Sequence, residues 1–372
     1  MKVGIHRDCS KMFYYRYRPF NQYTVKEIFS DEIYFSSAEE NNDPYEGFPF
    51  VVFKPDRSKW KKVLSFALDC KSFEIFSDAL LTHLCDLGEI SFNDFVFMDF
   101  HEVKGQISSG YKDVFDERIQ VLKVCVIQYV FQKCYFASFS RRKDNYLMWS
   151  HYADKHKGLC LIFAPYVEKY SKNVKLVLEP DSRGRIRSST FSNITYTDDV
   201  KILDGFDAFV PGVFNDSPIA NEKEWYAYQE NKRNFFLNKA KCWEHEAEVR
   251  LLHPDYEKPK YKSEDLPKNK RIIRYKSNQL VGIIFGLKMK DEDKLLVKEI
   301  ISKKQRLRDD PRPDNRPNIF MFFQSTMKKT KREIEIKPVY ACVDGALVDD
   351  CETLYKLWDF GDSGANYSMK PE

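Results

Sequence analysis

The sequence lacks the short motifs that mark the commonest nucleotide and hydrolase sites. It contains no G-x-G-x-x-G and no G-x-x-x-x-G-K-[ST], so neither a Rossmann dinucleotide turn nor a P-loop is indicated. It also contains no G-x-S-x-G and no H-E-x-x-H, the patterns of the nucleophile elbow and of the zinc-protease helix. Any site in this chain must therefore be built from other residues.

Paired cysteines and long apolar runs are missing too. The nine cysteines are scattered without a C-x-x-C spacing, which favours reduced core residues, and His151 and His156 lack the companion pair of a zinc site. The longest apolar stretch, Val121 to Phe131, is about half of the ~20 residues that a membrane span needs. Residues 1–20 are polar and basic, unlike a signal peptide. We therefore expect a cytoplasmic protein without a metal or a membrane contact.

An excess of one charge is also absent. Lys and Arg number 60 against 56 Asp and Glu, so the net charge of +4 gives no overall basic field for nucleic acid or anionic membrane. Aromatic residues, by contrast, are abundant, and 30 Phe with 22 Tyr can build a large core. The length of 372 residues fits two domains or one elaborated domain.

Hydrophobic periodicity divides the chain into strand-rich parts around a helical block. From Trp60 to Leu68 the apolar residues recur with helical spacing, and Phe73 and Phe76 extend this apolar face. Strand patterns on both sides of the block favour an α+β architecture. We expect an N-terminal part of the core at 1–57, a helical insertion at 58–131, the rest of the core at 132–345 and a C-terminal tail at 346–372.

Several elements have definite predicted bounds, and one of them is a strand over Cys134–Ser140. A capping-box spacing places a short helix over Thr24–Phe29, with Thr24 as its cap. A long charged helix is expected over Glu222–Lys239, and alternation predicts a half-buried strand over Glu246–Leu252. The continuous apolar run Leu280–Phe285 predicts a buried strand.

Two short strands carry polar side chains on one face each. Arg16 and Arg18 alternate with tyrosines and could clamp a pyrophosphate, although a solvated basic edge is the alternative. Ser138 and Ser140 share a face while Phe139 points into the core, and such hydroxyls can orient a carboxylate or bond a nucleotide.

A third segment concentrates carboxylates. As a strand, it would place Glu244, Glu246, Glu248 and Arg250 on one face. Three carboxylates in a row repel one another unless a cation or a substrate separates them, and such crowding raises the pKa of one of them. A solvated edge that Arg250 neutralises is the alternative.

Two further segments are ambiguous. Tyr152 follows Met148 at helical spacing and could stack on a flat heterocycle, or simply belong to the core. Residues 42–46 form a turn cluster in which Glu46 could be functional, but nothing local requires it.

Taken in order, these segments resemble one large bacterial domain-of-unknown-function family, family 2971. Its members begin with a K/R-Y-R strand and continue with an N-D-P-[FY]-E turn, an S-F-S strand, M-W-x-x-Y-A and W-x-x-E-x-E-x-R. The resemblance extends from about Tyr14 to Tyr340, and its matching segments are Tyr15–Arg18, Asn42–Glu46, Ser138–Ser140, Met148–Ala153 and Trp243–Arg250.

An arginine strand, an S-x-S strand and an E-x-E strand in this order are similar to the ADP-ribosyltransferase superfamily. The resemblance implies an α+β fold in which a split β-sandwich surrounds an NAD cleft, here with an inserted helical block. The superfamily often has Thr where this chain has Phe139. The implied site consists of Arg18 and then Arg16 for NAD, Ser138, Ser140 and Tyr152 along the cleft, Glu248 as the catalytic carboxylate and Glu246 on the acceptor side.

The resemblance thus predicts an NAD-dependent ADP-ribosyltransferase or NAD glycohydrolase. Its acceptor would be an unknown protein or nucleic acid, and its role would be that of a toxin or an antiviral-defence effector. Two alternatives stay open. Asp43, Glu46, Glu246 and Glu248 could hold Mg²⁺ in a nuclease, although the Lys that often follows such paired acids is missing. Otherwise the chain is a non-enzymatic protein whose helical block binds a regulatory partner.

Overall fold

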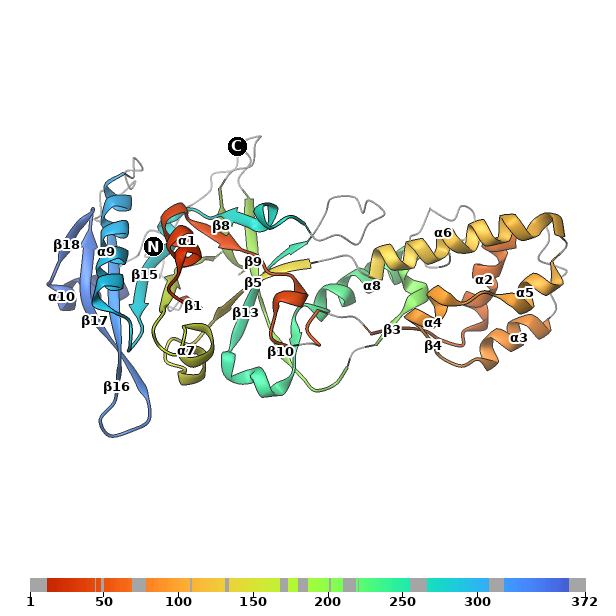
Figure 1. The fold of residues 1–372 in the computed structure, drawn as a ribbon, viewed down its shortest axis with the longest axis horizontal. Helices are drawn as coiled ribbons and strands as arrows, with labels where there is room; N and C mark the ends of the chain where they lie inside the picture. Colours follow the sequence, from red (N-terminus) through yellow and green to blue (C-terminus); the bar gives the residue numbers. More distant parts are fainter. Residues whose placement is uncertain are drawn as a thin grey trace, which may run out of the picture.

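The computed structural model describes most of the chain as a long sheet with a helical lobe at one end (Figure 1). The described residues are 12–43, 45–47, 50–68, 78–107, 109–130, 134–167, 173–179, 187–200, 202–209, 219, 221–254, 266–307 and 318–360. Phe73, Phe76, Pro44 and the part of the expected tail beyond residue 360 lie outside them. No helix among these residues has the length and apolar character to span a bilayer.

Among the described residues, eleven strands pair into one mixed sheet. The order across it is β18 (Ala346–Val348), β17 (Ile334–Val343), β16 (Ile319–Met327), β15 (Leu280–Phe285), β6 (Leu159–Phe163), β1 (Tyr14–Arg18), β5 (Cys134–Ser140), β13 (Glu248–Pro254), β9 (Arg187–Asn193), β8 (Val174–Leu178) and β7 (Tyr166–Val167). The α+β class is therefore confirmed. The buried strand predicted at Leu280–Phe285 is also confirmed, because every residue of β15 is buried.

Smaller pairings flank this sheet. β14 (Ile272–Arg274) pairs with β2 (Glu32–Tyr34), and β10 (Thr195–Tyr196) runs parallel to β12 (Asn238–Lys239). In the lobe, β3 (Phe50–Phe53) lies between β11 (Ile202–Asp204) and β4 (Ile90–Ser91).

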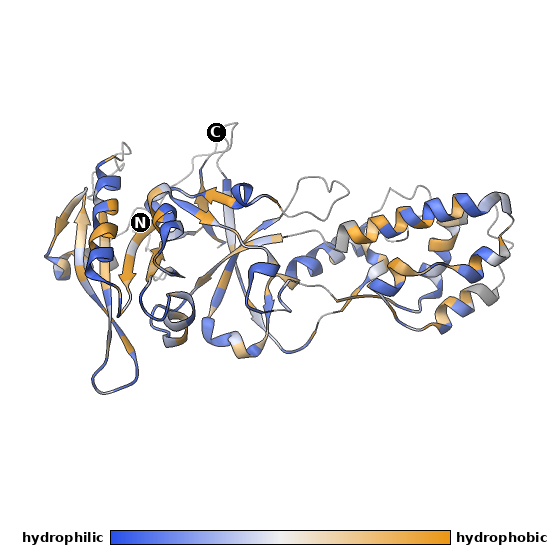
Figure 2. Cartoon of the chain, viewed as in Figure 1, coloured by the Kyte–Doolittle hydropathy of each residue, from blue (hydrophilic) through white to orange (hydrophobic). Residues whose placement is uncertain are grey.

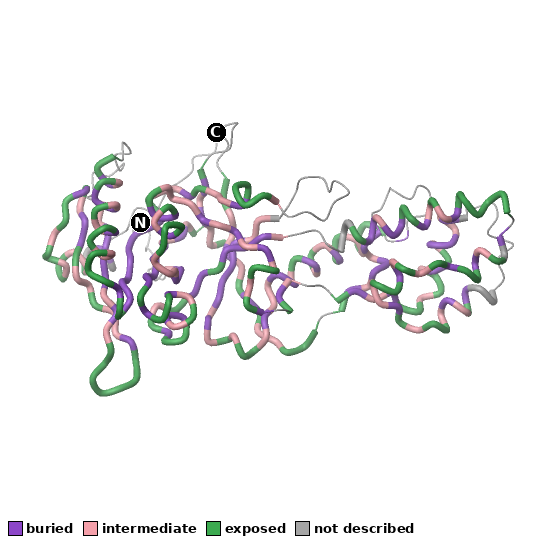
Figure 3. Tube along the Cα trace, viewed as in Figure 1, coloured by how far each residue is buried: buried purple, intermediate pink, exposed green. Residues whose placement is uncertain are grey.

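Helices cover both faces of the main sheet. On one face, α1 (Gln22–Ser30) and α9 (Asp291–Arg306) pack through Ile28 and Val297 on a core that includes Tyr14 and Phe139. On the other face, α7 (Tyr146–Tyr152) and α10 (Cys351–Phe360) pack through Trp149 and Trp358 on a core that includes Tyr15 and Tyr17. Figure 2 shows apolar residues along the central strands, and Figure 3 shows these strands buried beneath exposed helix surfaces.

The cap of one helix differs from its prediction, and another helix ends earlier than expected. α1 begins after Asn21, whose side chain accepts the Thr24 amide, while the Thr24 hydroxyl bonds to the Pro19 carbonyl. α8 (Glu222–Phe235) begins with a capping box between Asn221 and Glu224. It stops before Lys239, which lies instead on the short strand β12.

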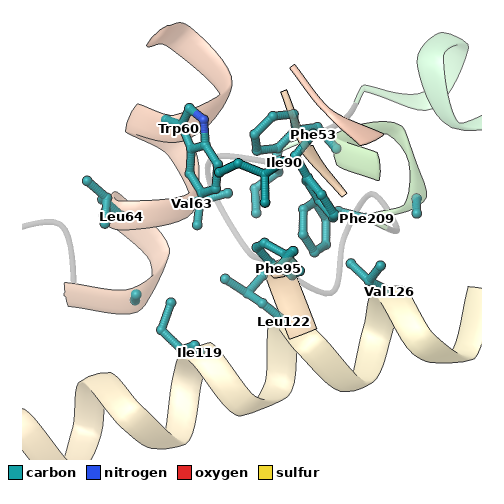
Figure 4. Packing of buried hydrophobic residues seen from close by; sticks show 14 of the residues in the cluster. Phe53, Trp60, Val63, Leu64, Ile90, Phe95, Ile119, Leu122, Val126 and Phe209 are labelled. Atoms are coloured by element: carbon teal, nitrogen blue, oxygen red, sulfur yellow. The ribbon is translucent and has the colours of Figure 1, made fainter. Parts of the chain in front are cut away.

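The helical lobe is larger than the insertion expected at 58–131. Its helices are α2 (Arg57–Leu68), α3 (Asp78–Asp86), α4 (Phe92–Phe97), α5 (His101–Gln106) and α6 (Lys112–Val130). Their core also takes in β3 and residues from 203–235, including Phe206. Figure 4 shows Phe209 in this core, near Phe53 and Phe95. The lobe is therefore assembled from two distant parts of the chain.

The C-terminal part also differs from the expected tail. Residues 346–348 form the edge strand β18, and α10 follows at once. Trp358 is buried against Phe13 and Phe323. Residues 346–360 thus belong to the sheet-packed core.

Candidate functional site

A buried group of charged side chains lies where β5 and β13 run side by side. Glu248 pairs with Ser140 and Arg250 pairs with Ser138. Directly paired residues of antiparallel strands project to the same side, so these four side chains share one face of the sheet. Tyr15 also pairs with Ser140, which makes this the face that carries α7 and α10.

Arg250 is the centre of this group and has no exposed surface. Its Nε donates to Glu248 Oε1 at 2.7 Å and its Nη2 donates to Glu248 Oε2 at 3.0 Å. Nη1 donates to the Phe236 carbonyl at 2.7 Å, and Nη2 also contacts Glu46. The guanidinium lies 4.0 Å from the ring centre of Phe136. Burial lowers the pKa of Arg250, and the nearby Asp43 carboxylate opposes that shift.

Lys239 is the second cation of the group, and it lies close to all three glutamates. Its Nζ donates to Glu246 Oε2 at 2.6 Å and to Glu248 Oε2 at 3.2 Å, and lies 3.8 Å from Glu46 Oε1. Burial acts to lower the pKa of Lys239, but Glu248 and Glu246 outweigh burial and raise it. Lys239 therefore stays charged between the carboxylates. We call Glu46, Lys239, Glu246, Glu248 and Arg250 the glutamate cluster.

Glu246 and Glu248 reach Lys239 because the chain turns sharply between them. Glu246 ends the short 3₁₀ helix η5 (Lys241–Glu246), Ala247 is left-handed with φ 47°, and Glu248 begins β13. The strand predicted from Glu246 therefore starts two residues later. Glu244 lies on η5 and is exposed, so the expected row of three carboxylates on one strand face is wrong.

Tyr152 and Tyr196 complete the polar contacts of the two glutamates. The Tyr152 hydroxyl donates to Glu246 Oε1 at 2.5 Å, and burial followed by Glu246 raises the pKa of Tyr152. The Tyr196 hydroxyl accepts the Glu248 amide at 2.7 Å, and burial raises the pKa of Tyr196 to about 12. Both phenols remain protonated at neutral pH.

The two serines have different surroundings. Ser140 is buried, donates to the Glu246 carbonyl at 2.6 Å and accepts the Arg142 amide at 3.0 Å, so it holds η5 against β5. Ser138 is exposed and its side chain hydrogen-bonds Glu248. Burial raises the pKa of Glu248, while Lys239 and the Ser138 hydrogen bond lower it. Ser138 is therefore an exposed residue in direct contact with the buried cluster.

Arg16 and Arg18 do not meet the glutamate cluster. Arg16 pairs with Leu161 and lies over the ring of Phe139, which places both arginines on the opposite face of the sheet. Arg16 binds Glu27 through Nε at 2.8 Å and the Ser138 and Tyr34 carbonyls through its other nitrogens. Arg18 Nε lies 2.9 Å from the same Glu27, and its side chain is 26% exposed. The alternation on β1 is as predicted, but the structure does not bring Arg18, Ser138 and Glu248 into one cleft.

Sequence reasoning did not predict the part that several residues play in this site. Glu46 was considered only as a turn residue and as a possible Mg²⁺ ligand, and Lys239 was placed at the end of a helix. Tyr196 reaches Glu248 through the pairing of β10 with β12, which local sequence cannot reveal. Within the part of the chain that the structure describes, no three His, Cys, Asp or Glu side chains are grouped as metal ligands. The glutamates of the cluster bind Lys239 instead.

The described cysteines carry no disulfide and lie outside the cluster. Cys125, Cys160 and Cys342 are buried, in agreement with reduced core residues, whereas Cys242 is exposed.

The molecule is thus an α+β protein with a buried charged cluster on neighbouring strands β5 and β13. The profile of a family described as "Protein of unknown function (DUF2971)" matches residues 148–251, from α7 to β13. This match is to the same family that the sequence motifs indicated. No curated protein and no solved structure matches it.

Proposed function

We propose that the chain cleaves the bond between nicotinamide and ribose in NAD and transfers ADP-ribose to an acceptor or to water. The observation that carries this proposal is the pair Glu246 and Glu248, bridged by Lys239 beside the exposed hydroxyl of Ser138. The adjacent positions of β1, β5 and β13 support it. β1 carries the arginines, β5 carries the S-x-S segment and β13 begins at the second Glu of the E-x-E segment, which is the order of the ADP-ribosyltransferase superfamily. The fold of that superfamily is part of the proposal.

The charge of the cluster suits this reaction. When ionised, Glu46, Glu246 and Glu248 outnumber Lys239 and Arg250, so the cluster has a negative excess. Departure of nicotinamide leaves an electron-deficient, oxocarbenium-like ribose, and fixed negative charge in a dry site stabilises such a group. Glu248, next to Ser138, would face the ribose, and Glu246 would orient the acceptor.

The phosphates of NAD require a cation on the face of Glu248. Arg16 and Arg18 lie on the opposite face, so a different residue must supply it in this proposal. Arg233 on α8 is exposed, and its Nη2 lies 3.4 Å from Ser192 Oγ. Ser192 pairs with Arg250 and shares its face, which puts Arg233 on the required side.

Release of nicotinamide from NAD by the purified protein tests the proposal. We expect Glu248→Gln to reduce this release roughly 100-fold or more, because the substitution removes the charge and keeps the shape. Glu244→Gln is the matched control, since this exposed carboxylate lies in the same segment outside the cluster. Thermal unfolding of each variant separates lost chemistry from lost folding. A folded wild-type protein that neither binds nor cleaves NAD rules the proposal out.

Glu246→Gln distinguishes transfer from hydrolysis. If Glu246 orients the acceptor, the variant releases nicotinamide to water but modifies the acceptor less. Because NAD loss harms a cell, the proposal includes a toxin or antiviral-defence role, which predicts that expression of the wild-type chain lowers cellular NAD and that expression of Glu248→Gln does not.

A second candidate function, a non-enzymatic interaction protein, is favoured by the surface of the helical lobe. Phe97 at the end of α4 is 83% exposed, an uncommon state for so large an apolar side chain. Complete pairing of Glu248 with Arg250 and Lys239 also suits a purely structural role. This candidate predicts that Phe97→Ser abolishes the cellular phenotype while Glu248→Gln leaves it intact, the reverse of the result expected for the enzyme.

A further inference from the structure

The hairpin formed by β16 and β17 extends beyond the neighbouring strand of the main sheet. The pairing of β15 with β16 ends at Phe285 and Gln324, whereas β16 and β17 stay paired up to Met327 and Ile334. Three residues of β16 therefore continue past β15, over about 10 Å at ~3.3 Å per residue. Figure 1 shows the hairpin projecting from the end of the sheet, and Figure 3 shows that its tip is exposed.

The base of this hairpin is anchored to the rest of the sheet. Ile334 is buried in the core that α7 and α10 cover, and the Ser325 hydroxyl donates to the Phe285 carbonyl at 2.9 Å. The Lys328 amide donates to the Glu333 carbonyl at 3.0 Å and closes the loop at the tip. The tip is thus held at one end of the sheet before any partner binds.

The tip of the hairpin is strongly basic. Its six residues between β16 and β17 contain four cations and one acid, Glu333, which lies 2.6 Å from Lys328. Lys329, Lys331 and Arg332 are exposed, and none of them forms an ion pair with the part of the chain that the structure describes. Cations so close together repel one another, and a polyanion relieves this repulsion.

More lysines lie beside the base of the hairpin. Gln324 on β16 donates to the Gly286 carbonyl at 3.1 Å. Gly286 and Lys288 donate their amides to carbonyls in the loop 154–158, at 2.9 Å each, so this loop and the turn 286–290 lie side by side. Together they contain four lysines, all exposed, and one acid. The acidic first turn of α9 marks one limit of this basic surface.

The width and the charge of the hairpin suit duplex DNA. Its two strands lie ~4.8 Å apart, and the major groove of B-form DNA, about 12 Å wide, admits a two-stranded ribbon. The major groove of duplex RNA is too narrow for side chains to enter. A membrane is a poorer fit, because Met327 is the only large apolar side chain that residues 325–334 expose.

We propose that the β16–β17 hairpin binds duplex DNA with its tip in the major groove. Lys329, Lys331 and Arg332 contact the phosphates that line the groove, and the lysines of 154–158 and 286–290 contact phosphates further along the duplex. The small net charge of the chain allows this, because only a local surface is basic. The proposal is independent of NAD cleavage, because none of these residues belongs to the glutamate cluster.

Fluorescence anisotropy of a labelled DNA duplex, titrated with the full chain at several salt concentrations, tests the proposal. A variant that combines Lys329→Gln, Lys331→Gln and Arg332→Gln removes three phosphate contacts. We expect it to bind at least about tenfold more weakly, and the slope of log affinity against log salt to fall by about 2.7. All three positions are exposed, and thermal unfolding checks that the variant keeps its fold.

The matched control removes the same charge elsewhere. It combines Lys223→Gln, Lys241→Gln and Lys268→Gln, at exposed positions outside the basic surface. We expect this control to keep the wild-type salt slope and to bind within about twofold of the wild type. Equal losses in the two triple variants overturn the proposal, because they would mean that only total charge matters.

Two further ligands test whether the partner is DNA. An RNA duplex of the same sequence should bind about tenfold more weakly, since its groove excludes the hairpin. Vesicles of phosphatidylcholine with about 30% phosphatidylserine, tested by sedimentation, should bind more weakly than the DNA duplex. The proposal is overturned if the wild-type chain does not bind the DNA duplex at low salt, or if either the RNA duplex or the vesicles bind as tightly as the DNA.

Discussion

Glu248 and Arg250 lie two positions apart on β13 and hold each other through two contacts, at 2.7 Å and 3.0 Å. Side chains at this spacing project to the same side of a strand, so the pair forms within one element and needs no distant partner to align it. Both side chains are buried, so each charge must be neutralised by a neighbouring side chain. Arg250 and Glu248 neutralise each other, Arg250 also contacts Glu46, and Glu248 also contacts Lys239.

Removal of the Arg250 charge should therefore destabilise the fold strongly. Arg250→Met keeps an apolar side chain over Phe136 but leaves Glu46 and Glu248 with less compensation. We expect a loss of about 3–5 kcal/mol in the free energy of unfolding, measured by urea denaturation. Arg274→Met changes a largely exposed arginine and should cost less than about 1 kcal/mol. Equal, small losses in both variants would show that the cluster is not tightly paired.

The proposed function predicts which arginine contacts NAD, because Arg233 and Arg18 lie on opposite faces of the sheet. Arg233→Ala should raise the KM for NAD about tenfold in the nicotinamide-release assay, because it removes a phosphate contact on the face of Glu248. Arg18→Ala should leave this KM within about twofold, because Arg18 pairs with Glu27 on the other face. The opposite ranking would restore Arg18 as the NAD-binding residue and contradict the face that the strand pairing assigns to it.

Local sequence patterns predicted the strands that form the centre of the sheet. The bounds of β5 and β15 agree with the alternation in Cys134–Ser140 and with the apolar run in Leu280–Phe285, because burial on one or both faces leaves a direct pattern. The two arginines of β1 do share a face as alternation requires. The local pattern does not reveal which face of the sheet these arginines occupy. That face depends on the register of β1 with β5, in which Tyr15 pairs with Ser140, a residue over 120 positions away.

The site was also predicted only in part, because some of its contacts depend on long-range strand pairing and on a turn without a sequence signal. Glu246, Glu248, Tyr152 and Ser138 do come together, but the turn at Ala247 has a left-handed backbone that nothing in the sequence marks. The cations that hold these residues come from elsewhere, since Lys239 lies on a two-residue strand that forms only by pairing with β10. Such long-range pairings leave no local periodicity to detect.

The discontinuous core of the helical lobe makes a prediction about stability. Phe206 is fully buried and meets Trp60 edge-on at 5.0 Å and Phe53 at 5.1 Å, although it lies about 75 residues beyond the expected end of the insertion. Phe206→Ala should lower the free energy of unfolding of the lobe by about 3–5 kcal/mol, through lost burial and the cavity left behind. Phe29→Ala, at a largely exposed position on α1, should cost less than about 1 kcal/mol. Hydrogen exchange along α2 and α6 would locate the loss, and unchanged protection there would contradict a shared core.

His156 should make the stability of the chain depend on pH. The ring is buried between Tyr146 and Trp149, and neither nitrogen has a hydrogen-bond partner among the described residues. Burial, followed by the charge of Lys288, lowers the pKa of His156 below its ordinary value of 6.5. As the pH falls through about 6.5, the unfolded chain takes up a proton that the folded chain refuses, so stability is lost below that pH and kept above it.

The variant His156→Asn isolates this contribution, because Asn does not titrate and tolerates the left-handed backbone at φ 70°. Urea denaturation at pH values from about 5 to 8 should show a smaller loss of stability at low pH in this variant than in the wild type. His101→Asn is the control, since that side chain is 84% exposed beside Asp99, and it should not flatten the acid limb. Parallel curves for the wild type and His156→Asn would mean that the buried ring keeps its ordinary pKa, and that the acid sensitivity arises elsewhere.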